Sequence, residues 1–313
     1  MYKRTVNEIF DLFCDIDIEN ENKKRMRTFD LQRAQKIINH PVVELLDYKI
    51  SSYAQDQEKH PRSLARIKNN RTVGALFYKE MILSKLDSDE YDSAKVLLLE
   101  FMKDHDVRPP WFYKTAICIF LHFGDIARGK DIIIKAKKAG AIENYAFEMS
   151  NLYFNKAKII DKEKGDKSEY LQFLLEGFEY DNTNPDIIEM LSYNISALMG
   201  NKKVMEQLKA GWVETPRYKT LEILFYLEPY KDEADLNTKC NDLLKKNNSD
   251  DAKIYLAKFL AIKAFYKLSL EILEKVREKT HNQSYDRVWA FLQIVYLNDN
   301  GKEKLEILKQ QIL

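Results

Sequence analysis

The chain is poor in the residues that interrupt regular secondary structure. Of its 313 residues only nine are glycine and seven are proline, which is below average usage for both. A chain with so few breakers has little room for the tight turns that many short β-strands require. Its abundant residues include leucine, lysine and glutamate, which enter helices at little cost. The composition therefore predicts an all-α fold.

Cysteine and long apolar runs are also scarce. Cys14, Cys118 and Cys240 are far apart, each lies among apolar residues, and no CxxC pair occurs. We expect three buried, reduced thiols, as in a protein of a reducing compartment. The N-terminal residues hold no apolar run long enough for a signal peptide, and no stretch approaches the ~20 apolar residues of a membrane span. The prediction is a cytoplasmic protein without membrane insertion.

Motifs that carry catalysis or bind cofactors are absent from the sequence. There is no HExxH, GxxxxGK[ST], GxGxxG or GxSxG pattern. The segment "KDHDV" (Lys103–Val107) clusters Asp104, His105 and Asp106. Consecutive residues point in different directions, so we interpret it as a polar loop and not as a metal site. We expect no catalytic residue, no metal and no cofactor.

An excess of charge of one sign is absent too. The formal net charge is +1, whereas a surface built for phosphate binding needs a concentrated positive field. Lys59, Arg62 and Arg66 share one face of an expected helix, which we interpret as solvated surface. Nucleic acid is therefore not an expected partner.

The few glycines are spaced in a regular way. Breaks between amphipathic segments fall at Asp89, Gly124, Gly165, Gly200, Ala264 and Asp299, with a weaker one at Glu228-Pro229-Tyr230. A distance of 35 residues separates Asp89 from Gly124, and the same distance separates Gly165 from Gly200. Such a period is typical of stacked helical hairpins. Five residues after three of the breaks stand small residues, Ala94, Gly129 and Ser269, which would let the second helix cross close to the first.

The pattern predicts paired helices along most of the chain. The expected pairs are 75–87 with 90–104, 110–123 with 126–139, 143–163 with 167–180, 186–199 with 202–211, 217–228 with 232–246, 251–263 with 266–279, and 284–297 with 300–312.

The segments "WFYKTAICIFLHFGDIARGKDIIIKAKKA" and "AKIYLAKFLAIKAFYKLSLEILEKV" resemble tetratricopeptide repeats. The break corresponds to position 15 of that repeat, and the small or apolar residues that follow correspond to its positions 20, 24 and 27. The resemblance covers residues 74–313 and implies a right-handed α-solenoid of about six or seven helical hairpins. Residues 1–73 do not follow the period, and we interpret them as an N-terminal helical cap over the first repeat.

The resemblance also implies where a partner would bind, in a concave groove lined by the first helix of each hairpin. Lys79 and Lys114 would occupy the same position in adjacent repeats and could receive an acidic segment or a carboxylate. The other candidate groove residues are Trp111, His122, Asn194 and Lys258. The family's carboxylate clamp needs lysine and asparagine at positions 5 and 9 of one repeat. It is not present here, because Cys118 follows Lys114 and Met190 precedes Asn194.

These observations predict a protein–protein interaction scaffold or adaptor that holds a segment of another protein or a peptide. Self-association stays open as a further use of the same surfaces. Three alternatives also stay open: an accessory or regulatory subunit of an enzyme assembly, for example in surface polysaccharide biosynthesis, a peptide-responsive regulator, and an enzyme in its own right.

Overall fold

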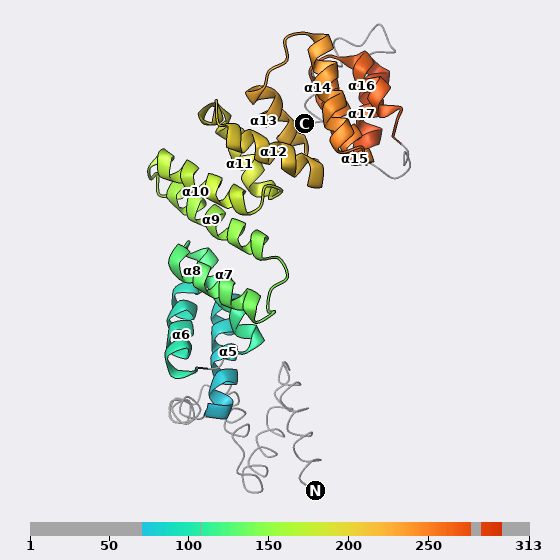
Figure 1. Cartoon of the computed structure of the whole chain (residues 1–313). Helices are drawn as coiled ribbons and strands as arrows, with labels where there is room; N and C mark the ends of the chain where they lie inside the picture. The colour runs from blue at the N-terminus through green and yellow to red at the C-terminus, as the bar shows by residue number, and fades with distance from the viewer. Residues whose placement is uncertain (1–70, 107, 277–282, 296–313) are drawn as a thin grey trace, which may run out of the picture. The chain divides into compact units, whose positions relative to one another are not determined.

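The computed structural model describes residues 71–106, 108–276 and 283–295, and all regular structure in these ranges is helical (Figure 1). The all-α prediction is therefore confirmed for this part of the chain. The chain divides into two compact units, Met1–Ile119 and Phe120–Leu313. The expected cap over residues 1–73 lies outside the described residues except for the start of the first helix, and the expected helix 300–312 lies outside them altogether.

The described part of the first unit consists of α5 (Arg71–Asp87), α6 (Tyr91–Asp104) and the first turns of α7 (Pro110–His122). Helix α5 packs against α6, and Phe77, Phe101 and Phe112 are fully buried. The guanidinium of Arg108 lies over the rings of Phe101 and Phe112, 5.6 and 5.3 Å from their centroids. An aromatic core thus holds this unit together.

The second unit contains the remaining helices. They are α8 (Ile126–Lys138), α9 (Tyr145–Lys162), α10 (Lys167–Tyr180), α11 (Pro185–Tyr193), the 3-10 helix η1 (Ile195–Leu198), α12 (Lys202–Glu214), α13 (Tyr218–Leu227), α14 (Glu233–Lys246), α15 (Asp250–Ile262), α16 (Tyr266–Leu273) and α17 (Gln283–Val295). Most helices begin and end within a few residues of the predicted positions. The expected helix 186–199 is instead broken at Asn194 into α11 and η1.

The turns within the hairpins share one backbone geometry. Asp89, Gly124 and Ala264 have positive φ angles of 57°, 56° and 67°, at the predicted breaks. At Gly124 the amide donates to the Leu121 carbonyl, and the next amide donates to the Phe120 carbonyl, both at 3.1 Å. The equivalent bonds occur at Asp89 and Ala264. These paired bonds define a left-handed helix C-cap, which satisfies carbonyls at the end of the first helix.

The third break differs from the prediction by one residue. The left-handed residue is Lys164, with φ 54°, and not Gly165. Gly165 has another constraint, because a Cβ atom at this position would lie 2.9 Å from Cγ2 of Ile160. This glycine is needed for space and not for backbone conformation.

Replacing Ala264 with glycine should stabilise the protein by about 0.5–1 kcal/mol, because alanine pays a steric cost in the left-handed region that glycine does not. The midpoint of urea unfolding, followed by far-UV circular dichroism, measures this. The matched control is Ala210→Gly on the exposed face of α12, which should cost about 1 kcal/mol. If both variants were destabilised equally, the left-handed turn would be refuted.

The small residues predicted in the second helices of the hairpins do not all contact the same neighbouring helix. A Cβ atom at Gly129 of α8 would lie 2.6 Å from Cδ1 of Leu152 on α9, so this glycine admits the first helix of the following hairpin. The contact that requires glycine here is therefore one with the following hairpin, which the sequence analysis did not anticipate. Ser269 of α16 does face its own hairpin, since its hydroxyl donates to the Ala257 carbonyl of α15 at 2.6 Å.

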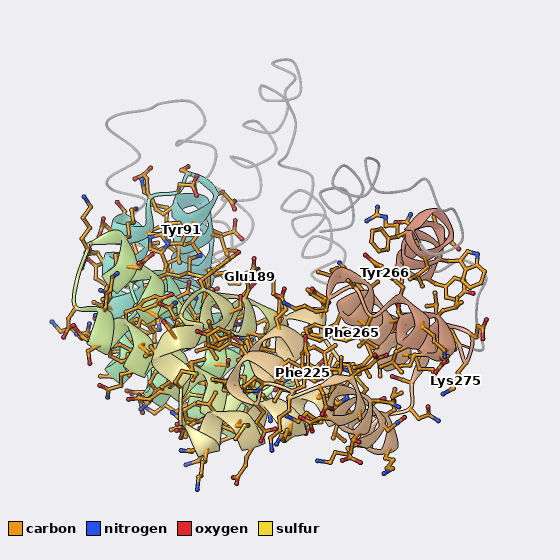
Figure 2. The ribbon with its side chains drawn as sticks, turned by 90° about the horizontal axis from the view of Figure 1, so that it is seen from above. Tyr91, Glu189, Phe225, Phe265, Tyr266 and Lys275 are labelled. Carbon is orange, nitrogen blue, oxygen red and sulfur yellow. The ribbon has the colours of Figure 1, made fainter. Side chains whose placement is uncertain are left out.

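The first helices of successive hairpins lie side by side in the second unit. Helix α11 packs against α13, α13 against α15, and α15 against α17 (Figure 1). Aromatic rings reinforce this packing: Phe225 of α13 stacks on Phe259 of α15 with centroids 4.6 Å apart, and Tyr230 bridges Phe225 and Phe265. Phe225 and Phe265 are labelled in Figure 2. The outward side chains of these helices therefore share one face of the unit.

The thiols follow the prediction only in part. Cys240 is fully buried in α14, and burial raises the pKa of its thiol to about 12, so it stays protonated and unreactive at neutral pH. Cys118 was also expected to be buried, but it lies on the exposed side of α7. The apolar residues next to it in sequence point elsewhere on the helix. Cys14 is outside the described residues.

Candidate partner-binding face

The side chains around Lys258 form a group of interacting charged and tyrosine residues on the first helices. We call this group the first-helix face. Its members are Glu189 and Tyr193 of α11, Tyr218, Lys219 and Glu222 of α13, Lys258 of α15 and Arg287 of α17. Each helix thus contributes at least one charged side chain to a single surface.

Lys258 is half-buried at the centre of this face. Its ammonium nitrogen lies 4.8 Å from the centroid of the Tyr218 ring, in the geometry of a cation–π contact. Burial lowers the pKa of Lys258, and the nearby charges of Arg287 and Lys219 lower it further, while Glu222 acts in the opposite direction. The ammonium group is therefore partly desolvated and lies among like charges.

The carboxylate of Glu222 interacts with several neighbouring side chains. Its carboxylate forms an ion pair with Lys219 at 2.9 Å, which raises the pKa of that lysine. Burial raises the pKa of Tyr218, and the charge of Glu222 and its hydrogen bond with the phenol raise it further. The Glu222 carboxylate thus lies near Lys219 and Lys258, and Glu189 is a second carboxylate near Lys219. On α11, Glu189 accepts a hydrogen bond from the Tyr193 hydroxyl at 3.0 Å.

The residues predicted from the groove lie in both units. Lys79 on α5 is half-buried, and Lys114 on α7 is exposed. Trp111 is half-buried as expected, but its indole ring packs 5.3 Å from the Phe101 ring, so part of it supports the core of the first unit. His122 is exposed at the end of α7, with its ring 5.1 Å from that of Phe123.

Asn194 has a local structural role that the sequence analysis missed. Its side-chain amide donates to the Met190 carbonyl at 2.8 Å, and its backbone amide donates to the Leu191 carbonyl at 3.0 Å. Its side chain also hydrogen-bonds the Tyr170 hydroxyl, which partly offsets the rise in the pKa of Tyr170 caused by burial. The residue therefore ends α11.

The remaining members of the first-helix face were not predicted. Tyr218, Lys219 and Glu222 belong to the hairpin with the weakest repeat pattern, where Pro229 replaces the small residue of the break. The spacing of Lys219 and Glu222, three residues apart on one helix, indicates only a local ion pair. Their proximity to Lys258 and Arg287 follows from the packing of α13, α15 and α17.

The sequence analysis predicted no metal site. Within residues 71–106, 108–276 and 283–295, no group of three histidine, cysteine, aspartate or glutamate side chains could hold a metal. The segment expected to be a polar loop lies at the end of α6 and in the loop that follows, with Asp104 and Asp106 exposed, and only the half-buried His105 ring joins the core by stacking on Phe101 at 4.7 Å. Asp104 accepts a hydrogen bond from the Tyr78 hydroxyl at 3.0 Å. Burial lowers the pKa of His105.

No family model matches the sequence, and the comparison with curated proteins finds no significant match. Among the helices of the described residues, none combines the length and the hydropathy that crossing a bilayer requires.

Proposed function

We propose that the protein is a binding scaffold whose helical hairpins form a right-handed solenoid of the tetratricopeptide type, and that the first-helix face binds an acidic segment of a partner protein. The observation that carries the proposal is the position of Lys258, half-buried on Tyr218, with the like charges of Lys219 and Arg287 nearby and the carboxylate of Glu222 offsetting part of them.

The helical packing supports this arrangement. Tetratricopeptide repeats line their binding groove with the first helix of each hairpin, and here α11, α13, α15 and α17 lie side by side. The left-handed turns at Asp89, Gly124 and Ala264 recur at the spacing that suggested the repeat. The carboxylate-clamp pattern of the family is missing, so the specificity of this chain would rest on the residues of the first-helix face.

An acidic side chain bound at this face would reduce the repulsion between Lys258 and Arg287. A carboxylate between Lys258 and Arg287 would accept charge-assisted hydrogen bonds from both and would screen each cation from the other. The ring of Tyr218 offers an apolar surface for the stem of the same residue. The surrounding exposed charges would mainly set the rate of association and the choice of partner.

We expect the double substitution Lys258→Glu/Arg287→Glu to lower the recovery of the partner at least about tenfold, as the loss of one charge-assisted hydrogen bond would. Affinity purification from the native host, quantified by mass spectrometry, makes the measurement. The matched control is Lys135→Glu/Lys138→Glu on the exposed surface of α8, which should recover the same partner as the unmodified protein.

Lys79→Glu/Lys114→Glu, examined in parallel, tests whether the predicted lysine column in the first unit contributes. If all variants and the unmodified protein captured the same partners in equal amounts, binding would not involve the first-helix face. An enzyme among the partners that depend on this face would make the protein an accessory subunit of that enzyme.

A further inference from the structure

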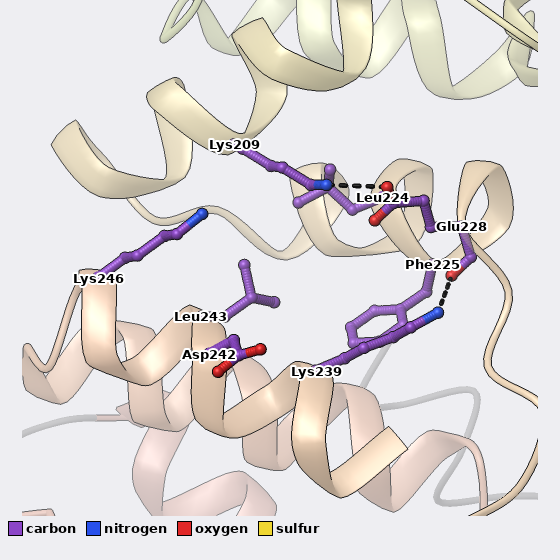
Figure 3. A pocket seen from close by; sticks show the side chains of 8 residues that line it. All are labelled: Lys209, Leu224, Phe225, Glu228, Lys239, Asp242, Leu243 and Lys246. Atoms are coloured by element: carbon purple, nitrogen blue, oxygen red, sulfur yellow. Dashed lines mark hydrogen bonds and ion pairs between the residues drawn. The ribbon is translucent and has the colours of Figure 1, made fainter. Parts of the chain in front are cut away.

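A small pocket opens between α12, α13 and α14 in the second unit (Figure 3). Its volume is about 160 Å³. The side chains that line it are Lys209 of α12, Leu224 and Phe225 of α13, Glu228 directly after α13, and Lys239, Asp242, Leu243 and Lys246 of α14. None of these residues belongs to the first-helix face, so the pocket is a separate feature.

The inner part of the pocket is apolar and well ordered by packing. Leu224, Phe225 and Leu243 are each no more than 8% exposed. The Phe225 ring is held by stacking on Phe259, with centroids 4.6 Å apart. An enclosed apolar cavity of about 150 Å³ is large enough to hold benzene. This pocket is partly open to solvent, and its similar volume fits one ring-sized apolar group against the apolar inner wall.

The rim of the pocket is charged, and its two carboxylates already form ion pairs with lysines. Glu228 forms an ion pair with Lys209 at 2.9 Å, and Asp242 forms one with Lys245 at 3.0 Å. Lys239 donates to the carbonyls of Glu228 and Pro229 at 3.1 and 2.9 Å. These contacts leave the two carboxylates of the rim with lysine partners from the protein itself.

Lys246 differs from the other lysines of the rim. Its side chain is exposed and extends towards the pocket, as Figure 3 shows, and no carboxylate within the described ranges forms an ion pair with it. Lys209 extends towards the same opening from α12 (Figure 3). The rim therefore carries three lysines and two carboxylates, and the uncompensated positive charge lies at Lys246.

We propose that this pocket binds a carboxylate attached to a single aromatic ring, with the ring against Phe225 and Leu243 and the carboxylate at Lys246. The apolar interior sets the size of the ligand, and the rim sets the sign of its charge. Such a group could be a free aromatic acid or a phenylalanine at the end of a peptide. The two sources share this chemistry and differ in the amide next to the carboxylate.

Titration of the full chain with phenylacetate, followed by isothermal calorimetry and by chemical shifts of the bound ring, tests the proposal. A ligand of this size should bind with a dissociation constant of about 1–10 mM. Phenylacetamide has the same ring without the charge and should bind at least about fivefold more weakly, and benzylamine, which has the opposite charge, should not bind. Equal binding of all three would overturn the proposal, as would an absence of binding by phenylacetate.

A variant locates the site. Lys246→Gln should weaken phenylacetate at least about fivefold, while the matched control Lys202→Gln, on the exposed surface of α12, should leave it unchanged. Both positions are exposed, so neither change should unfold the protein. Phenylacetate binding that is unaffected by Lys246→Gln would place the ligand elsewhere and refute the assignment.

N-acetyl-phenylalanine distinguishes the two sources of the group. Tighter binding than phenylacetate assigns the pocket to a peptide end, and weaker binding assigns it to a free acid. Because the pocket shares no residue with the first-helix face, loss of partner capture in Lys258→Glu/Arg287→Glu and loss of phenylacetate binding in Lys246→Gln report on separate proposals.

Discussion

Replacing Trp212 with alanine should destabilise the second unit by about 4 kcal/mol. Trp212 is fully buried, and it is the bulkiest of the fully buried side chains described. Its indole nitrogen donates to the Leu243 carbonyl, 3.3 Å away on α14. Alanine would leave a large cavity between α12 and α14 and would remove that hydrogen bond, and substitutions of this kind typically cost 3–5 kcal/mol. Urea unfolding followed by far-UV circular dichroism measures the loss without relying on tryptophan fluorescence.

Two further variants define the origin of this effect. Trp212→Phe keeps most of the buried volume and should cost roughly half as much, because it loses the hydrogen bond and part of the packing. Tyr226→Ala on α13 removes an aromatic ring that is 48% exposed and should change stability by less than about 0.5 kcal/mol. An alanine at position 212 with an effect as small as that of Tyr226→Ala would contradict the buried position of the indole.

Replacing Asn184 with leucine should cost about 3 kcal/mol. Asn184 is 1% exposed and stands at the start of α11. Its side-chain oxygen accepts from the backbone amides of Asp186 and Ile187, and its side-chain nitrogen donates to the Ser150 hydroxyl at 3.0 Å. Leucine would remove the helix cap and leave these buried polar groups without partners, and each of the two losses costs about 1–2 kcal/mol.

Asn184→Ser separates the two roles. Serine can still cap α11 through its hydroxyl, but it is too short to reach Ser150 on α9. We expect it to recover about half of the stability that leucine loses, measured by the same unfolding transition. If serine were as damaging as leucine, the cap would contribute little, and the bond to α9 would account for the whole effect.

The sequence predicted the helices well because their pattern is local. Apolar spacing and the breaks at Asp89, Gly124 and Ala264 depend on neighbouring residues only, and these turns were confirmed. What the sequence analysis missed depends on tertiary packing. Leu152 of the next hairpin lies against Gly129, and the unexpected exposure of Cys118 depends on which side of α7 faces the core.

The candidate sites were less predictable for the same reason. Lys258 was found by counting along the repeat, but the charges around it belong to helices more than twenty residues away in sequence. The pocket shows more clearly why such a site cannot be predicted from the sequence. Lys209, Leu224 and Lys246 form no motif, and they line one cavity only because α12, α13 and α14 surround it.

The loop between α10 and α11 has a mechanical consequence. Asn182 donates to the Gln207 carbonyl of α12 at 3.1 Å, Asn184 donates to Ser150 of α9, and Arg217 donates to the Thr183 carbonyl at 3.2 Å. Four residues of loop thus connect two consecutive hairpins and the approach to a third through directional bonds. Bending at this point would have to break several of these bonds together. We therefore expect this part of the second unit to be stiff under mechanical load and the unit to bend at other points.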